Sequence, residues 1–334
     1  MLTMNKISQK ISNKSQFKQK LDKFIANNID PNIGINRMLT FAKRNRVTVS
    51  TDLEEYRSGH LTTMRIRQAI LLKLIAVSIA LRFSISSAFN QRSVLIVMSD
   101  PNKSQGNQRL ISFMAVFIST LILLIDTFNF IREVTHTSTF LSFVSDFTQN
   151  RVIPLSARNY SRLAFRLNLV SKCLIELSFW PLVIASTVFL NGTVIIHYLD
   201  PNSGFTLLSI IPWGILSVIF IVGVFAQAFS GCVAITFVVF YLKYKFDEIL
   251  AKFRTGLKLK DRSILMRAIS EHNFIGKRTD DLNDFFRFVI FLLYFFATIP
   301  LMILVNLVFD KDTSFYFRLF AGVVFILGIL TVFH

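Results

Sequence analysis

Six stretches of this 334-residue chain stay mostly apolar for about 20 residues or more, and this feature restricts the fold more than any other. A helix rises about 1.5 Å per residue, so about 20 apolar residues cross the roughly 30 Å hydrocarbon core of a bilayer. The sequence therefore predicts an all-α, polytopic transmembrane bundle in residues 69–334, preceded by a polar and basic arm in residues 1–68. The expected spans are residues 69–90, 110–131, 169–190, 212–241, 287–309 and 314–334.

The composition also favours a membrane protein over a soluble enzyme. Hydrophobic residues make up 52% of the chain and charged residues only 17%, whereas about 25% is usual in soluble domains. The net charge of +17 comes from Lys and Arg that gather in polar stretches between the apolar runs, so we expect a lipid bilayer and no nucleic acid as partner.

Cys173 and Cys232 each lie inside an apolar run, and no disulfide framework is expected. Residues 1–68 lack the apolar core of a cleaved signal peptide, so the first span is expected to act as an uncleaved insertion signal.

The fourth apolar run decides how many times the chain crosses the membrane. As one helix, residues 205–242 would be about 57 Å long. Splitting the run near residues 227–231 would leave a second piece too short to cross. We therefore expect one long span, with residues 205–211 as an interfacial shoulder before Pro212.

Orientation follows from the Lys and Arg residues of the polar segments. Residues 1–68, 132–168 and 243–286 together carry 28 of them, and the alternate segments carry 4. This asymmetry predicts a cytoplasmic N-terminus and supports six crossings. Asn102 and Asn191 open glycosylation sequons in predicted outer loops, but Asn13 and Asn159 open sequons on the predicted inner side, so sequons do not decide the topology.

Residues 243–286 differ from an ordinary loop because apolar residues recur at helical spacing in residues 243–253 and 264–286. The fourth and fifth spans are therefore expected to extend into the cytoplasm as amphipathic helices.

The chain contains no P-loop, no Gly-rich dinucleotide turn, no His-Glu-x-x-His motif and no Cys pair at metal spacing. We accordingly expect no enzyme activity, no cofactor and no metal.

Ionisable residues inside spans are costly and are the first place to look for function. Lys73 and Asp126 lie at matching depths near the inner ends of two spans and are expected to pair, in a structural or a functional role. Lys172 and Glu176 are four residues apart and would pair along one helix, with outward snorkelling of Lys172 as the alternative. Arg82 has no acid at its depth, so snorkelling is favoured over contact with a ligand or water cavity.

The outer halves of the spans carry aromatic and polar groups that would suit either interfacial anchoring or a small apolar ligand pocket. These candidate ligand-binding residues are Phe113, Phe117, Trp213, Asn306, Tyr316 and Phe320. The fourth span also carries Ala226, Ser230 and Ala234 at four-residue steps, a pattern typical of close helix packing.

One segment resembles a known family. The stretch ILMRAISEHN, from Ile264 to Asn273, is followed by DLNDFF, from Asp281 to Phe286, which leads into the fifth span. A helical stretch with a His-Asn-like pair, followed by an apolar-Asn-x-Phe-like stretch, resembles the arthropod gustatory receptors and, at this level, the insect odorant receptors. The resemblance covers the topology of the whole chain, but sequence detail only from about residue 239 to residue 309.

This resemblance implies a seven-span, ligand-gated cation channel of the plasma membrane that senses a small tastant or odorant. It further implies a homo- or hetero-tetramer joined through the cytoplasmic extensions of the late spans, where Ile269, Phe274, Ile275 and Leu282 are the expected assembly residues. The family's seventh span and its terminal signature do not appear before His334. Either the sequence is truncated, which we favour, or this copy does not conduct.

Two other classes of function stay open. A transporter would show two similar halves and helices broken at mid-membrane. Pro181 and Pro300 do interrupt the third and fifth spans, but no similarity between halves is visible. The second alternative is a structural or assembly membrane protein without a ligand.

Overall fold

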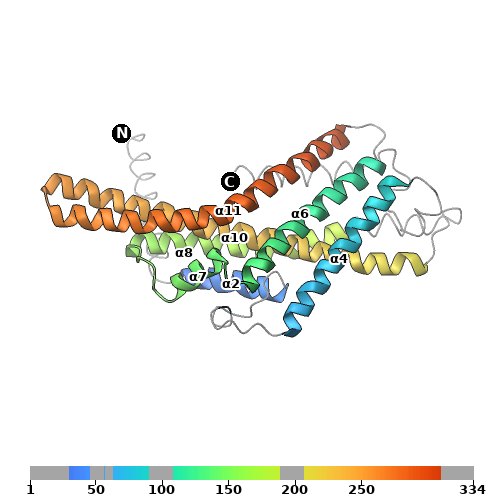
Figure 1. Cartoon of the computed structure of the whole chain (residues 1–334), viewed down its shortest axis with the longest axis horizontal. Helices are drawn as coiled ribbons and strands as arrows, with labels where there is room; N and C mark the ends of the chain where they lie inside the picture. Colours follow the sequence, from blue (N-terminus) through green and yellow to red (C-terminus); the bar gives the residue numbers. More distant parts are fainter. Residues whose placement is uncertain (1–29, 46–55, 57–62, 90–107, 189–206, 310–334) are drawn as a thin grey trace, which may run out of the picture. The chain divides into compact units, whose positions relative to one another are not determined.

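The computed structural model describes residues 30–45, 56, 63–89, 108–188 and 207–309, and all regular structure in these ranges is helical (Figure 1). The predicted all-α fold is therefore confirmed for the described residues. The helices are α2 (Pro31–Arg44), α4 (Thr63–Ala88), α6 (Gln108–Val134), α7 (Thr139–Thr148), α8 (Ala157–Ser171), a π-helix (Lys172–Ser178), α10 (Leu207–Leu259) and α11 (Arg262–Phe309).

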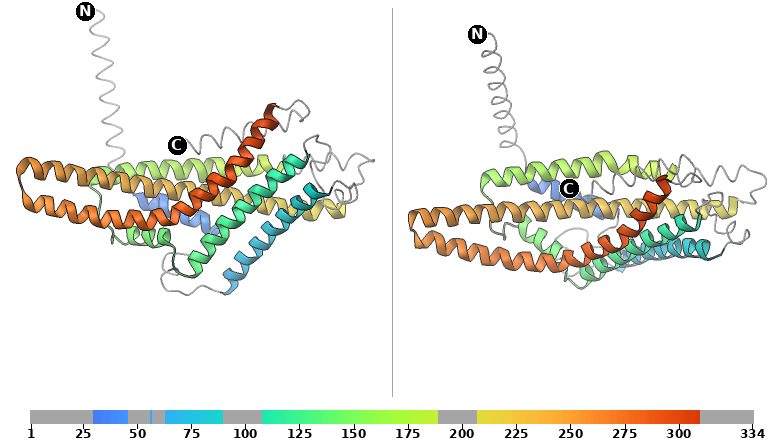
Figure 2. Two further views of the ribbon diagram at one scale, coloured as in Figure 1. Left: turned by 45° about the horizontal axis from the view of Figure 1, so that its top comes forward. Right: turned by 90° about the horizontal axis from the view of Figure 1, so that it is seen from above.

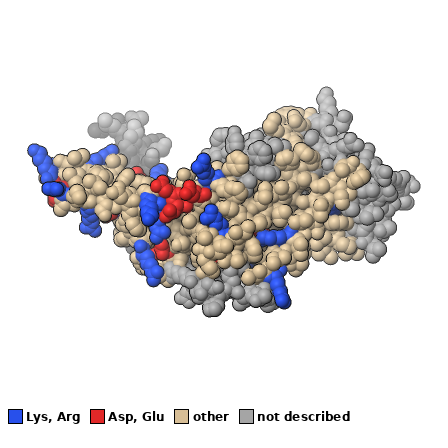
Figure 3. Space-filling model, viewed as in Figure 1, with Lys and Arg blue, Asp and Glu red and all other residues tan. Residues whose placement is uncertain are grey.

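Four helical segments of the described residues are long and apolar enough to cross a membrane, namely Ala69–Ser86, Ala115–Val134, Ala157–Val188 and Ile211–Leu259. Their large apolar side chains are mostly uncovered by protein, and on α4 this includes Leu71, Leu74 and Leu81. The surface over α4 and α6 accordingly carries few charged side chains (Figure 3). Such a surface is suited to lipid, because large uncovered apolar patches are rare on soluble proteins.

The other two predicted spans are not among these four. Residues 287–309 continue α11 as a helix, and residues 314–334 lie outside the described residues. Six crossings and a cytoplasmic N-terminus therefore stay predictions.

The chain divides into two compact units. Unit 1 comprises Met1–Phe41, Ser142–Ser178 and Phe229–Asp281, and unit 2 comprises Ala42–Leu141, Phe179–Ala228 and Leu282–His334. Each unit is described below on its own.

Unit 1 contains a helical hairpin in which the end of α10 and the start of α11 lie side by side (Figure 2). The reversal is tight because Lys260 adopts a left-handed conformation, with a φ of 52°, at the end of α10. The Asp261 amide then donates to the Gly256 carbonyl (3.0 Å), while the Asp261 carboxylate accepts from the amides of Ser263 (2.8 Å) and Ile264 (3.3 Å). One short turn thus ends one helix and caps the next.

Gly256 also allows the two helices of the hairpin to approach. A Cβ atom there would lie 2.9 Å from the Leu265 side chain. Any larger residue would require the Leu265 side chain to move. The predicted helical extensions, residues 243–253 and 264–286, are confirmed, because α10 and α11 run through them without interruption.

An aromatic cluster joins α7 to α10 inside unit 1. Phe143 and Phe147 of α7 contact Phe237 and Tyr241 of α10, with ring centroids 4.9 to 5.7 Å apart. All four side chains are buried, and the Tyr241 hydroxyl donates to the Ile153 carbonyl (3.0 Å). Since aromatic rings bury large apolar areas and prefer tilted contacts, this cluster is the packed core of unit 1.

Part of the predicted N-terminal arm is a packed helix. Helix α2 buries Ile35, Met38 and Phe41, which recur at three-residue steps. It lies close to α8, because a Cβ atom on Gly34 would meet Leu167 at 2.8 Å. Residues 16–27, for which the sequence also predicts a short helix, lie outside the described residues.

In unit 2, α4 and α6 pack along each other (Figures 1 and 2). Leu121 and Ile125 of α6 are buried together, one helical turn apart. The Phe128 ring lies 4.5 Å from Phe288 and 5.8 Å from Phe285 of α11, centroid to centroid. Helix α4 begins at Thr63, six residues before the predicted start of the first span.

The fourth apolar run is one helix, as predicted, and Pro212 lies near the start of α10. The third run begins earlier than predicted, because helical structure starts at Ala157 rather than at residue 169. A π-helix interrupts this run just before Pro181. Proline has no amide hydrogen to donate, and π-turns accommodate such breaks in the α-helical hydrogen bonds.

Candidate functional site

The expected pair of Lys73 and Asp126 is present. Lys73 of α4 donates to the Asp126 carboxylate of α6 at 2.5 Å, and both side chains are largely buried. The Lys73 ammonium also lies 4.4 Å from the centre of the Phe130 ring. An ammonium over an aromatic face gains electrostatic stabilisation. The pair therefore joins two apolar helices through a charge contact that is shielded from solvent by protein.

The snorkelling interpretation of Arg82 is wrong. Its side chain is 4% exposed, its guanidinium donates to the Ser217 hydroxyl (3.2 Å), and it lies 5.0 Å from the Trp213 ring centre. The guanidinium thus contacts a hydroxyl and an indole face, both on α10. Arg82 is thus an internal link between α4 and α10.

The expected Lys172–Glu176 pair is also wrong. Glu176 pairs with Arg37 of α2 (2.7 Å), which further donates to the Ser171 hydroxyl (2.9 Å). Lys172 is exposed. The contact depends on the packing of α2 beside this run, which the spacing of residues in the sequence does not indicate, so the competing guanidinium was not anticipated.

The predicted ligand-binding residues do not form one pocket in the described residues. Phe113 and Phe117 contact each other along α6 (4.7 Å between ring centres), and Trp213 contacts Arg82. Asn306 is exposed near the end of α11. Tyr316, Phe320 and the sequon residues Asn102 and Asn191 lie outside the described residues.

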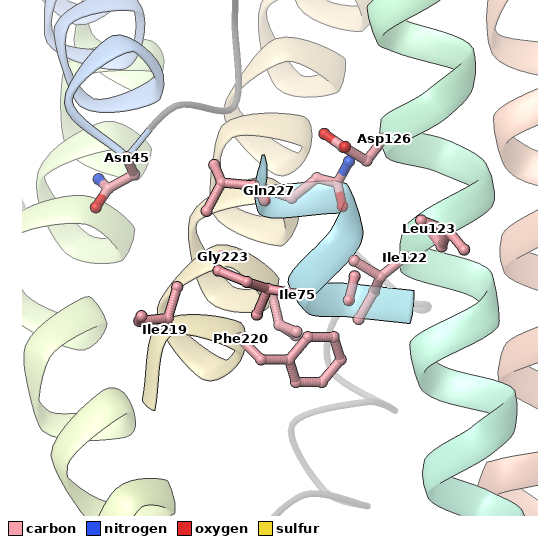
Figure 4. Close-up of a pocket in the computed structure, with 12 residues that line it drawn as sticks. Asn45, Ile75, Ile122, Leu123, Asp126, Ile219, Phe220, Gly223 and Gln227 are labelled. Atoms are coloured by element: carbon pink, nitrogen blue, oxygen red, sulfur yellow. The ribbon is translucent and has the colours of Figure 1, made fainter. Parts of the chain in front are cut away.

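A cavity of about 60 Å³ lies beside the Lys73–Asp126 pair in unit 2 (Figure 4). Its walls come from α4, α6 and the first half of α10, with Asn45 also at its edge. Most of the lining is aliphatic, and Asp126 and Gln227 add polar groups. The volume exceeds the roughly 10–15 Å³ that a cavity needs in order to hold one water molecule.

The four expected assembly residues divide into two pairs. Ile275 and Leu282 are 1% and 2% exposed, so they pack within the chain. Ile269 and Phe274 are 42% and 41% exposed on α11, which leaves their apolar surface open for contact with another molecule. The small residues Ala226, Ser230 and Ala234 are buried, in agreement with a packing role.

An ionic cluster in unit 1 was not predicted. Lys245 of α10 is 1% exposed and donates to the Pro154 carbonyl (2.9 Å). Its ammonium lies 3.3 Å from the Glu248 carboxylate and 3.7 Å from that of Glu271. Lys252 donates to both oxygens of Glu271 (2.6 and 2.7 Å). The cluster thereby connects both helices of the hairpin to the segment that precedes α8.

The carboxylates of this cluster are well satisfied. Glu248 accepts from the Ser156 amide (2.7 Å), the Ser156 hydroxyl (2.6 Å) and the Asn159 amide group (2.9 Å). Burial raises the pKa of Glu271, but the hydrogen bond from Lys252 and the charges of Lys245, Lys252 and Arg267 outweigh burial and leave this pKa below its ordinary value. The Glu271 carboxylate is therefore charged at neutral pH, and the cluster acts as a structural connector.

No group of His, Cys, Asp and Glu side chains in the described ranges has the arrangement of a metal site. Cys173 and Cys232 are both free thiols. Comparison with protein-family models, with curated proteins and with solved structures gives no match to this chain.

Proposed function

We propose that this chain is a chemosensory receptor of the gustatory type, a multi-pass protein of the plasma membrane and a subunit of a tetrameric, ligand-gated cation channel. The N-terminus lies in the cytoplasm, and the ligand is a small external molecule. The α10–α11 hairpin is the observation that carries the proposal. In this hairpin two apolar helices continue as charged helices. The family resemblance implies that the contacts between subunits lie there.

The surface of the hairpin supports an assembly role. Beyond residue 241, α10 continues for about 27 Å, and α11 returns beside it. Lys and Arg residues are interspersed here with apolar side chains that no other part of the chain covers. These exposed apolar residues are Leu250, Leu257, Leu259, Met266, Ile269 and Phe274. Exposed apolar surface of this kind is typical of protein interfaces, and burial between subunits would remove it from water.

Oligomeric state provides the first test. Light scattering of the detergent-solubilised chain is expected to give a tetramer. Ile269→Lys and Phe274→Lys are expected to shift the protein toward monomer, because a charge in a packed apolar interface is costly to desolvate. The control Asn273→Lys adds the same charge at an exposed polar position and should leave the size unchanged. Ile275→Lys should instead lower the yield of folded protein, since Ile275 is buried within the chain. A monomeric wild type would contradict the proposed assembly.

Topology provides the second test. An epitope tag at the N-terminus should bind antibody only after cells are permeabilised. The reason is that 28 Lys and Arg residues lie in the N-terminal segment and in the loops predicted on the same, cytoplasmic side. A tag in residues 191–203 should bind antibody on intact cells. Surface staining of the N-terminal tag would overturn the orientation.

Ion flux separates the receptor from the transporter alternative. The π-helix before Pro181 is the feature that favours a transporter, because broken helices are frequent at transporter sites. Cells that express a receptor channel should show cation currents within milliseconds of applying an active tastant. Saturable uptake of a solute coupled to Na⁺ or H⁺, without such currents, would support the transporter.

A further inference from the structure

The cavity beside Lys73 and Asp126 contains an unsatisfied polar group. The Gln227 side-chain nitrogen is buried and has no hydrogen-bond partner. Figure 4 shows the Gln227 amide pointing toward the Asp126 carboxylate across the end of the cavity. A buried N–H without an acceptor is unfavourable, so an oxygen atom placed between the two groups would be stabilised.

Charge restricts what this oxygen can belong to. Lys73 already neutralises Asp126, and the two side chains are in direct contact. An added anion would face the Asp126 carboxylate, and an added cation would face the Lys73 ammonium. A neutral group that can both accept and donate a hydrogen bond therefore fits best, and a hydroxyl has these properties.

The remaining walls of the cavity are apolar and favour a ligand that carries an alkyl group beside its hydroxyl. Ile75 of α4, Ile122 of α6 and Phe220 of α10 lie below the polar end (Figure 4), and Ile219 of α10 also lines the cavity. Water would satisfy Gln227 but would leave these side chains in contact with a polar molecule. At about 60 Å³ the cavity is smaller than the 150 Å³ cavity that accommodates benzene, so it fits a molecule of about three heavy atoms.

We propose that this cavity is a binding site for short-chain primary alcohols such as ethanol and 1-propanol. The hydroxyl oxygen accepts from the Gln227 nitrogen, the hydroxyl hydrogen is donated to the Asp126 carboxylate, and the alkyl chain lies against Ile75 and Ile122. The site is separate from the predicted ligand residues, because Ile122 lies about 13 Å along α6 from Phe113. Binding here does not depend on the receptor function proposed above.

The test uses saturation-transfer difference NMR on the full chain in lipid nanodiscs, with a series from methanol to 1-hexanol. The amount of each alcohol bound is expected to be highest for ethanol or 1-propanol and to fall for longer alcohols, because the cavity fits only about three heavy atoms. Partition into lipid alone would rise continuously with chain length. A continuous rise in the wild type would overturn the proposal without affecting the receptor function.

Two glycines of α10 provide matched variants. A Cβ atom added at either Gly223 or Gly231 meets no atom within 4 Å, but only Gly223 lines the cavity. Gly223→Leu is expected to reduce the ethanol signal at least fivefold, whereas Gly231→Leu should leave it unchanged. Gln227→Leu removes the polar partner and should give a similar loss for alcohols. Equal ethanol signals in wild type, Gly223→Leu and Gln227→Leu would show that the cavity holds water only and would overturn the proposal.

Discussion

In unit 1 the Lys245 ammonium is buried between two carboxylates and a backbone carbonyl, and these groups belong to three separate segments of the chain. In unit 2, Lys73 and Asp126 join neighbouring helices whose remaining surface is mostly apolar and uncovered. A buried charge is tolerated only where hydrogen bonds replace its hydration. Unit 1 therefore contains a buried charge cluster whose carboxylates accept several hydrogen bonds, whereas unit 2 contains one ion pair between helices with uncovered apolar surfaces.

The ionic cluster of unit 1 should show the largest effect. Lys245→Met keeps the length of the side chain but leaves Glu248 and Glu271 without their buried cation. We expect a loss of about 3 kcal/mol or more in the free energy of unfolding, seen as a lower thermal midpoint in detergent or as loss of folded protein. The control is Lys243→Met, two residues earlier and exposed, which should have little effect. Equal effects of both variants would mean that the cluster contributes no specific stability.

The Lys73–Asp126 pair should have a smaller and non-additive effect. Lys73→Leu and Asp126→Leu each leave one unpaired charge among apolar helices, and each should cost about 2 kcal/mol. The double variant should be more stable than either single variant, because it leaves no unpaired charge. Additive losses, measured by thermal unfolding across the four proteins of the cycle, would argue against an energetic coupling.

The turn of the α10–α11 hairpin offers a stabilising change. Lys260 has a φ of 52°, a conformation that glycine adopts at lower cost than any other residue. Lys260→Gly should therefore raise the stability by about 1 kcal/mol. Lys258→Gly, in the last turn of α10, should lower it by about the same amount, because glycine is a poor helix former. A loss of stability in both variants would contradict the assigned backbone conformation.

The smallest expected effect is a pH dependence that belongs to unit 1. The pKa of Glu271 is lowered in the folded chain, so its contribution to stability is complete above the ordinary value of 4.5 and disappears as the pH falls through the folded pKa. The thermal midpoint of the wild type should therefore fall more steeply than that of Glu271→Gln below about pH 4.5. Asp284→Asn, at an exposed acid of the same helix, should retain the wild-type slope.

The parts of the fold that sequence predicted are those that depend on local periodicity. Apolar residues at helical spacing indicated that the fourth and fifth apolar runs continue as helices, and α10 and α11 do so. The pairing of Lys73 with Asp126 was also predictable, because both residues lie at similar depth in apolar runs where few other charges compete.

The contacts that sequence missed depend on where the chain turns. Lys245 meets Glu271 only because the hairpin reverses at Lys260 and Asp261, and neither residue is a glycine or proline that would mark a turn. Asp261 followed by Ser263 is a helix-capping signal that would have placed the start of α11. Arg82 was misjudged because an acid, a ligand and a water cavity were the partners weighed, whereas its contacts include the Trp213 ring and the Ser217 hydroxyl.

The π-helix between Lys172 and Ser178 has a consequence for how the chain can vary. Along the run Ala157–Val188 the buried side chains recur every four residues, at Leu163, Leu167, Ser171, Ile175, Phe179 and Val183. In an uninterrupted α-helix each four-residue step would rotate the buried face by about 40° in one direction. The wider π-turn reverses part of this drift, so the run contains the equivalent of a one-residue insertion. Deletion of one residue within 172–178 would therefore convert the π-turn to α-helix and leave the orientation of the downstream helix nearly unchanged, and a relative that lacks the π-turn should align with a single-residue gap at this place.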